Sequence, residues 1–152
     1  MAITSFGRGD DEKMAAARNR LERELLEIEA TGLNGEGAPR VPNTTNIYFD
    51  GIEGEALVIA LDLKELAVST GAACSSGAIE PSHVLIAMGL RPERAKASIR
   101  FSLGRQNGPE DTEFALGLIP ETVARLRELS PVYSTAASSR LRATSNQRGG
   151  RR

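Results

Sequence analysis

The order of apolar and polar residues predicts helices in the first third of the chain, followed by an extended segment. Between residues 11 and 31, helix formers predominate and apolar side chains recur at helical spacing, so we expect an amphipathic helix that ends at Gly32. Its apolar positions are Met14, Leu21, Leu25 and Ile28. Residues 32–43 are rich in Gly and Pro, which predicts a connector made of turns. Residues 46–50 then predict a strand.

The middle of the chain predicts two further helices around a loop. Residues 53–65 carry an apolar helix face with acidic residues in the first turn. A short apolar strand should follow, and then a mobile loop, because residues 69–78 are almost all small. A helix should start around Pro81 and end at Gly89, followed by a short helical turn at residues 91–98. The expected apolar face of that helix is formed by Val84, Leu85 and Met88.

The last third predicts a strand with one wet face and a long helix. Ile99, Phe101 and Leu103 alternate with Arg100 and Ser102, so the pleat should place Arg100 opposite the core. Residues 109–129 predict a helix that is kinked, or lacks one backbone hydrogen bond, at an internal proline. Its expected buried stripe is Phe114, Leu118, Ile119, Val123, Leu126 and Leu129.

Composition favours one domain and argues against a polyanion-binding protein. The chain has 152 residues, of which 40% are hydrophobic, which is enough for one core. The net charge of -1 gives no reason to expect nucleic acid as a ligand. Neither a signal-peptide core nor about 18 consecutive apolar residues occur, so we expect a soluble cytoplasmic protein without membrane contact. Residues 134–152 are basic and nearly free of large apolar side chains, which predicts a disordered tail.

Few residues in this sequence could carry chemistry. Cys74, the single cysteine, lies among small residues and is either a buried structural thiol or an accessible nucleophile. His83 could pair with it, but an ordinary exposed histidine at a helix start is the simpler interpretation. Arg100 or Arg105 could hold a carboxylate through the planar guanidinium, although most arginines are solvated surface residues. No cluster of metal ligands and no phosphate-binding glycine loop is apparent.

Three motifs, in order, resemble the C-terminal domain of cysteine desulfurases of the NifS/IscS type, which belong to the class-V aminotransferases. They are STGAACSSGAIEPSHVLIAMGL, SIRFSLGR and ARLRELSPVY, and PNTTNIYFDGIEGEALVIAL before them also matches. This resemblance implies an α+β domain in which a small, mostly antiparallel sheet is covered by helices. It covers residues 14–133, and leaves residues 1–13 as a disordered or leader remnant and residues 134–152 as the tail.

The resemblance also implies the chemistry. In that family a loop cysteine takes sulfur from L-cysteine bound to pyridoxal phosphate, L-alanine leaves, and a persulfide remains for an iron–sulfur scaffold or another sulfur acceptor. Cys74 matches that cysteine, and Arg100 matches the residue that holds the substrate carboxylate. His83 gains no role from the resemblance. The intact enzymes are expected to be homodimers.

One departure from the family limits what this chain can do alone. Family members carry the lysine that binds the cofactor in a large N-terminal domain, and none of Lys13, Lys64 and Lys96 stands in that setting. We therefore expect a desulfurase part that depends on a separate pyridoxal-phosphate-binding half. A non-enzymatic sulfur carrier or interaction module, and a truncated product without function, remain as alternatives.

Overall fold

The computed structural model describes residues 8–70 and 80–130 of the chain. In chain order the elements are α1 (Arg8–Leu25), β1 (Thr31–Leu33), β2 (Thr44–Phe49), α2 (Gly54–Asp62), α3 (His83–Ala87), α4 (Pro92–Lys96), β3 (Ser98–Ser102) and α5 (Pro109–Leu129). Helices and an antiparallel sheet therefore share one domain, which confirms the expected α+β class.

The sheet has the order β1-β2-β3, and both pairs of strands are antiparallel. Ile47 of β2 lies opposite Ile99 of β3, and Asn46 lies opposite Arg100. Because successive side chains point to opposite faces, one face of these strands is apolar and the other polar. The period-two pattern read from residues 99–103 is confirmed, since Ile99 and Phe101 are buried and Arg100 and Ser102 are exposed.

The apolar face of the sheet forms the core together with three helices. Phe49 and Phe101 meet edge to face there, with ring centroids 6.5 Å apart. The cluster is completed from α1, α2 and α5 by Leu21, Leu25, Leu57, Leu61, Ala115, Ile119 and Val123. Each fully buried aliphatic or phenyl side chain stabilises the fold by about 1.5–3 kcal/mol relative to its exposed state, so this face fixes how the strands are oriented.

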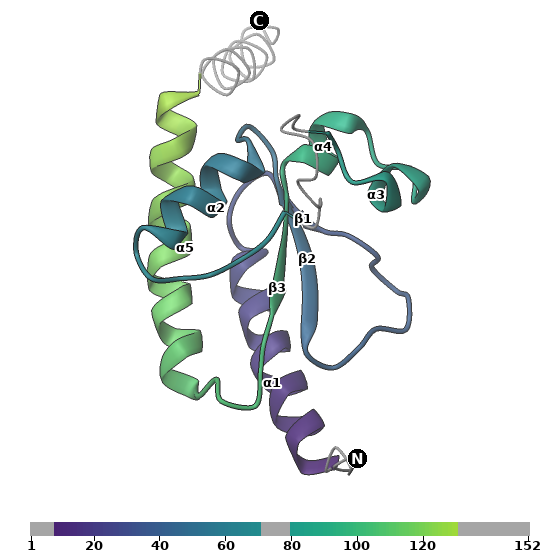
Figure 1. The fold of residues 1–152 in the computed structure, drawn as a ribbon, viewed down its shortest axis with the longest axis vertical. Coiled ribbons are helices and arrows are strands. Elements are labelled where there is room, and N and C mark those ends of the chain that lie inside the picture. The colour runs from purple at the N-terminus through teal and green to yellow at the C-terminus, as the bar shows by residue number, and fades with distance from the viewer. Residues whose placement is uncertain (1–7, 71–79, 131–152) are drawn as a thin grey trace, which may run out of the picture.

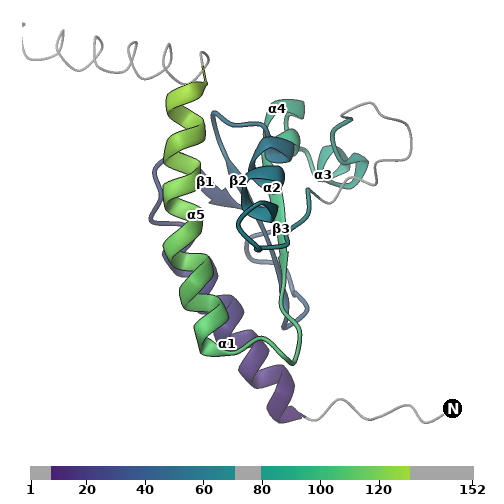
Figure 2. The ribbon, with the colours of Figure 1, turned by 60° about the vertical axis from the view of Figure 1, so that its left-hand side comes forward.

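Figures 1 and 2 show how the layers are arranged. Helices α1 and α5 lie side by side and run in the same direction, and α5 also packs on α2. Helices α3 and α4 lie on the other side of the sheet from α5, and α4 contacts β2 (Figure 2). The helical cover is therefore complete on the apolar face and partial on the polar face.

The first helix differs from the prediction at both ends. It begins at Arg8, so the expected domain boundary at residue 14 falls inside α1. It ends at Leu25 rather than at Gly32, and Gly32 belongs to β1, where it pairs with Tyr48. The helical pattern continues in the sequence, but pairing with β2 offers residues 31–33 a full set of sheet hydrogen bonds, and Ala30 makes the turn with a φ of 53°.

Two predicted apolar faces and one predicted strand were partly wrong. In α3 only Leu85 is buried, whereas Val84 and Met88 are 55% and 52% exposed. In α5, Phe114 and Leu129 are exposed, because the stripe that meets the core runs through Ala115, Ile119, Thr122 and Val123. The apolar run before residue 69 forms one β-bridge at Ser69 rather than a strand. The predicted proline effect does not interrupt α5, which continues through Pro120.

No helix among the described residues combines the length and the apolar character that crossing a bilayer requires. The predicted mobile loop and the predicted basic tail fall in the segments 71–79 and 131–152, outside the described residues.

Candidate functional site on strand β3

Arg100 lies at the centre of β3 and projects from the polar face of the sheet. Its neighbours Ile99 and Phe101 are 0% and 4% exposed and hold the strand against the core. Arg100 itself is exposed, and its side chain forms no ion pair with any of the described residues. An exposed guanidinium without a carboxylate partner can bind a carboxylate through two parallel N–H donors.

The free edge of β3 pairs with the segment that leads toward Cys74. The Arg100 amide donates to the Ser69 carbonyl at 2.6 Å, and the Ser69 amide donates to the Arg100 carbonyl at 3.2 Å. This two-bond pair fixes Ser69 directly beside Arg100. Cys74 follows five residues later, in the segment outside the described residues, so its own position is not part of this geometry.

A buried polar network supports the same face of the sheet. Asn34, at 8% exposure, donates through Nδ2 to Asn46 Oδ1 at 2.6 Å and to Ser98 Oγ at 2.9 Å. Ser98 Oγ in turn donates to the Arg94 carbonyl at 2.7 Å. Asn46 is the cross-strand neighbour of Arg100, so the network fixes the residue next to the candidate carboxylate site.

A second pair closes the end of this face near α4. Arg94 binds Asp50 through two bonds, Nε to Oδ1 at 3.2 Å and Nη2 to Oδ2 at 2.9 Å. Its guanidinium carbon also lies 4.4 Å from the centre of the Tyr48 ring. The hydrogen bonds to Asp50 raise the pKa of Arg94 above its ordinary value. Arg94 is thus held by protein groups, whereas Arg100 is not.

The other residues singled out in the sequence lie apart from this arrangement in their contacts. His83 is the first residue of α3 and is exposed. Arg105 lies beyond the end of β3 and pairs with Asp10 of α1, with 3.5 Å between Nε and Oδ2. Among residues 8–70 and 80–130, no three His, Cys, Asp or Glu side chains are grouped so that they could hold a metal ion.

Sequence reasoning found Arg100 but missed the residues around it. Ser69, Asn46 and Asn34 gave no signal, because a bridge partner and a cross-strand partner depend on register rather than on local spacing. The Arg94–Asp50 pair was missed for the same reason, since 44 residues separate the partners. Only Arg100 stood inside a recognisable motif.

The lysines of this chain do not form a pyridoxal-phosphate site by themselves. Lys13 and Lys64 are exposed, and Lys96 is half-buried near the C-terminal end of the five-residue helix α4. A Schiff-base lysine needs an enclosing pocket together with groups that hold the phosphate and the pyridine ring. The cofactor therefore does not fit the described residues alone, and such a site requires residues beyond this chain.

With this geometry described, comparison with known proteins defines the class of protein. Residues 8–114 match the model of the aminotransferase class-V family, and the chain belongs to that family. The chain is 47% identical over 124 residues to the cysteine desulfurase IscS of Methylococcus capsulatus, covering 82% of this chain. It is 45% identical over 124 residues to the cysteine desulfurase IscS of Aeromonas hydrophila, again covering 82%.

Solved structures agree with the sequence comparison. A NifS-like protein from Rickettsia africae superposes with a TM-score of 0.66 at 30% identity, over 76% of this chain and 29% of that one. A second NifS-like protein gives the same TM-score at 26% identity, over 78% of this chain and 29% of that one. The chain spans about 30% of the length of the curated relatives it matches.

Proposed function

We propose that the chain is the cysteine-carrying part of a cysteine desulfurase, in which Arg100 binds the carboxylate of L-cysteine and Cys74 accepts the sulfur. The carrying observation is the position of Arg100, whose unpaired guanidinium stands on the polar face of β3 beside the segment that leads to Cys74. The family match and the similarity to proteins named cysteine desulfurase support the same reaction class.

The chain connection supports pairing these two residues in one site. Ser69 is bonded to Arg100 and lies five residues before Cys74. A fully extended chain covers about 3.5 Å per residue, so Cys74 can be no more than about 18 Å from Ser69 along the chain. That reach allows one cysteine to meet a substrate held by Arg100 and then an acceptor outside the site.

The proposed step is a sulfur transfer that conserves atoms and electrons. The Cys74 thiolate attacks the sulfur of the substrate, a new S–S bond forms, and the C–S bond of the substrate breaks. The electron pair of that bond stays with carbon, which takes a proton to give L-alanine, and Cys74 keeps the persulfide. A cofactor held outside this chain must stabilise the carbon during the transfer.

The proposal requires partners. Pyridoxal phosphate and its lysine are to be supplied by a large-domain half, and the persulfide is to be passed to an iron–sulfur scaffold or another sulfur acceptor in the cytoplasm. A homodimer is proposed for the complete assembly. Nucleic acid and membranes are not proposed as partners.

Reconstitution tests the enzymatic proposal. The chain is mixed with a lysine-bearing large-domain half, pyridoxal phosphate and L-cysteine, and alanine and sulfide are measured. We expect turnover from the mixture, at least a hundredfold less with Cys74→Ser, and a KM for L-cysteine raised at least tenfold with Arg100→Met, because its bidentate carboxylate contact is lost. Arg91→Met, a change at an exposed arginine outside the proposed site, serves as the control.

A second candidate function is sulfur transport without catalysis. The absence of a fitting lysine pocket in the described residues favours it. In that case an intact desulfurase should label Cys74 with sulfur from labelled L-cysteine, and the mixture with a large-domain half should release no alanine. Alanine release above the background of each half alone would reject this candidate in favour of the enzyme.

A further inference from the structure

A cavity of about 480 Å³ lies between the first turns of α1 and the connection from β3 to α5. Its apolar walls come from Met14, Ala16, Ala17, Leu103 and Pro109. Figure 1 shows the β3–α5 connection passing beside α1 at the lower end of the molecule. A cavity of this size with mostly apolar walls is in the range of sites for small organic molecules.

Thr112 supplies an unsatisfied hydroxyl to this cavity. It lines the cavity from the first turn of α5 and is only 5% exposed. Its Oγ1 atom is buried and has no hydrogen-bond partner among the described residues. A buried hydroxyl without a partner costs about 1–3 kcal/mol, so such an atom indicates a missing acceptor or donor.

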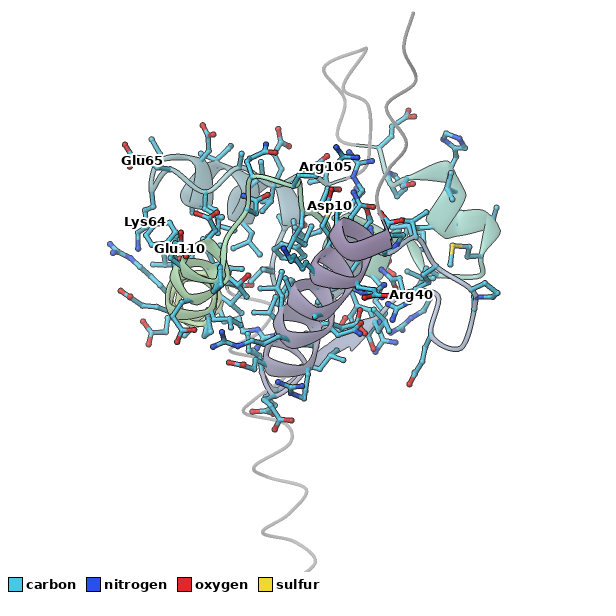
Figure 3. The ribbon with its side chains drawn as sticks, turned by 90° about the horizontal axis from the view of Figure 1, so that it is seen from below. Asp10, Arg40, Lys64, Glu65, Arg105 and Glu110 are labelled. Atoms are coloured by element: carbon cyan, nitrogen blue, oxygen red, sulfur yellow. The ribbon has the colours of Figure 1, made fainter. Side chains whose placement is uncertain are left out.

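Most charges around the cavity are already paired within the protein. Asp10 and Arg105 form an ion pair beside it, as Figure 3 illustrates. Arg20 is bound by Glu24 and Glu113, and these hydrogen bonds raise its pKa.

The start of α5 is also occupied by protein groups. Asp111 accepts hydrogen bonds from the Gly108 amide and from Asn107, and the Glu110 carboxylate lies close to Gly108. Lys13 is the lining cation that takes part in no ion pair among the described residues. The uncompensated charge at this cavity is therefore positive, and it stands at α1.

We infer that this cavity binds a small apolar monocarboxylate. The apolar body packs against Met14, Leu103 and Pro109, the Thr112 hydroxyl donates to a carboxylate oxygen, and Lys13 balances the charge. Both features demand an acceptor on the ligand, since an orphan hydroxyl and an unpaired ammonium can each donate to one carboxylate. Because the cavity involves neither Cys74 nor Arg100, this inference stands or falls separately from the proposed function.

Binding is measured with the whole chain by calorimetry, using naphthalene-2-carboxylate as the probe and naphthalene-2-methanol as its neutral analogue. We expect saturable one-site binding of the carboxylate, at least fivefold tighter than that of the alcohol. Equal affinities for the two probes, or no binding of the carboxylate up to millimolar concentration, would overturn the inference.

Three variants locate the probe. Thr112→Val and Lys13→Met should each weaken carboxylate binding about threefold to tenfold, and Ala17→Phe should abolish it by filling the cavity. Lys64→Met is the matched control, because Lys64 lies on α2 at the opposite side of the view in Figure 3. A loss of affinity in Lys64→Met equal to that in Lys13→Met would overturn the assignment.

Folding effects are separated from binding effects through Thr112. Removing an orphan hydroxyl while keeping the side-chain shape should leave the thermal midpoint unchanged or raise it, even as binding weakens. A Thr112→Val chain that binds the carboxylate as tightly as the original chain contradicts the inference. Deletion of residues 1–7 tests the chain's own N-terminal segment as occupant: a tenfold rise in affinity on deletion would assign the cavity to that segment instead.

Discussion

Arg127 shows how a charged residue can be part of a core. It lies on the buried side of α5 at 6% exposure and donates to three backbone carbonyls, those of Glu29, Ala30 and Asp50, at 2.7, 3.1 and 3.1 Å. These carbonyls belong to the turn before β1 and to the end of β2. One side chain thus joins the last helix to two segments that lie 77 to 98 residues away in sequence.

Replacing Arg127 with Met should lower the free energy of unfolding by about 3 kcal/mol, because three carbonyls lose their charged donor. Urea denaturation followed by circular dichroism measures the change. Arg125→Met, at an exposed position of the same helix, should change stability by less than about 0.5 kcal/mol. Equal effects of the two substitutions would contradict the structural role given to Arg127.

Glu22 predicts a specific acid sensitivity. Burial acts to raise the pKa of Glu22, but hydrogen bonds from Arg40 and Thr45 outweigh it and hold the pKa below the ordinary 4.5. A lowered pKa in the folded state means that ionised Glu22 contributes its full stability above about pH 4.5 and loses it as the pH falls through the folded-state value.

Glu22→Gln should therefore lower stability at pH 7, by about 1–2 kcal/mol, and flatten the loss of stability below pH 4.5. Unfolding free energies measured between pH 7 and pH 3 test this. The exposed Glu12→Gln variant should follow the original curve. An unchanged slope in Glu22→Gln would show that other carboxylates cause the acid sensitivity.

At the scale of elements, the start of α2 depends on a glycine for close packing. Gly54 is buried, and a Cβ atom there would lie 2.5 Å from the Lys96 carbonyl, which is backbone and cannot swing away. Gly54→Ala should therefore destabilise the fold by more than about 2 kcal/mol. Gly117→Ala in α5 meets no atom within 4 Å and should stabilise by about 0.5–1 kcal/mol. Thermal denaturation of both variants checks this contrast, and shifts in the same direction would contradict it.

Element boundaries reveal where local pattern stops being informative. The kinds of element at residues 46–50, 53–65 and 109–129 were predicted correctly, because their apolar periods reflect burial on one side. Strand β1 was missed, since three residues with Gly at the centre carry no readable period. Phe114 was assigned to the wrong face of α5 because any large apolar residue in a helix fits some stripe when the partner is unknown.

At the scale of the whole molecule, apolar surface remains uncovered on α3. Val84, Ile86 and Met88 are 55%, 38% and 52% exposed, although the helix also buries Leu85. Exposed apolar groups on neighbouring positions are typical of surfaces that meet another protein or another part of the same protein. This agrees with a chain that spans about 30% of the length of its relatives.

The double substitution Val84→Gln with Met88→Gln should reduce the binding of a hydrophobic dye and any self-association seen by sedimentation. The free energy of unfolding should change by less than about 0.5 kcal/mol, because neither side chain is buried. Leu129→Gln, at an exposed position on α5, is the control and should leave association unchanged. If dye binding persists in the double variant, the exposed surface lies elsewhere.

The sequence by itself determined the α+β class, the placement of Arg100 opposite the core and the motifs shared with cysteine desulfurases. These follow from periods of two and 3.6 and from contiguous motifs, which are properties of neighbouring residues. The tertiary structure alone decided that Ser69 pairs with Arg100, that Arg127 binds the turn before β1, and that Thr112 faces a cavity without a partner. Such contacts join residues far apart in the chain, and only the folded backbone sets which of them meet.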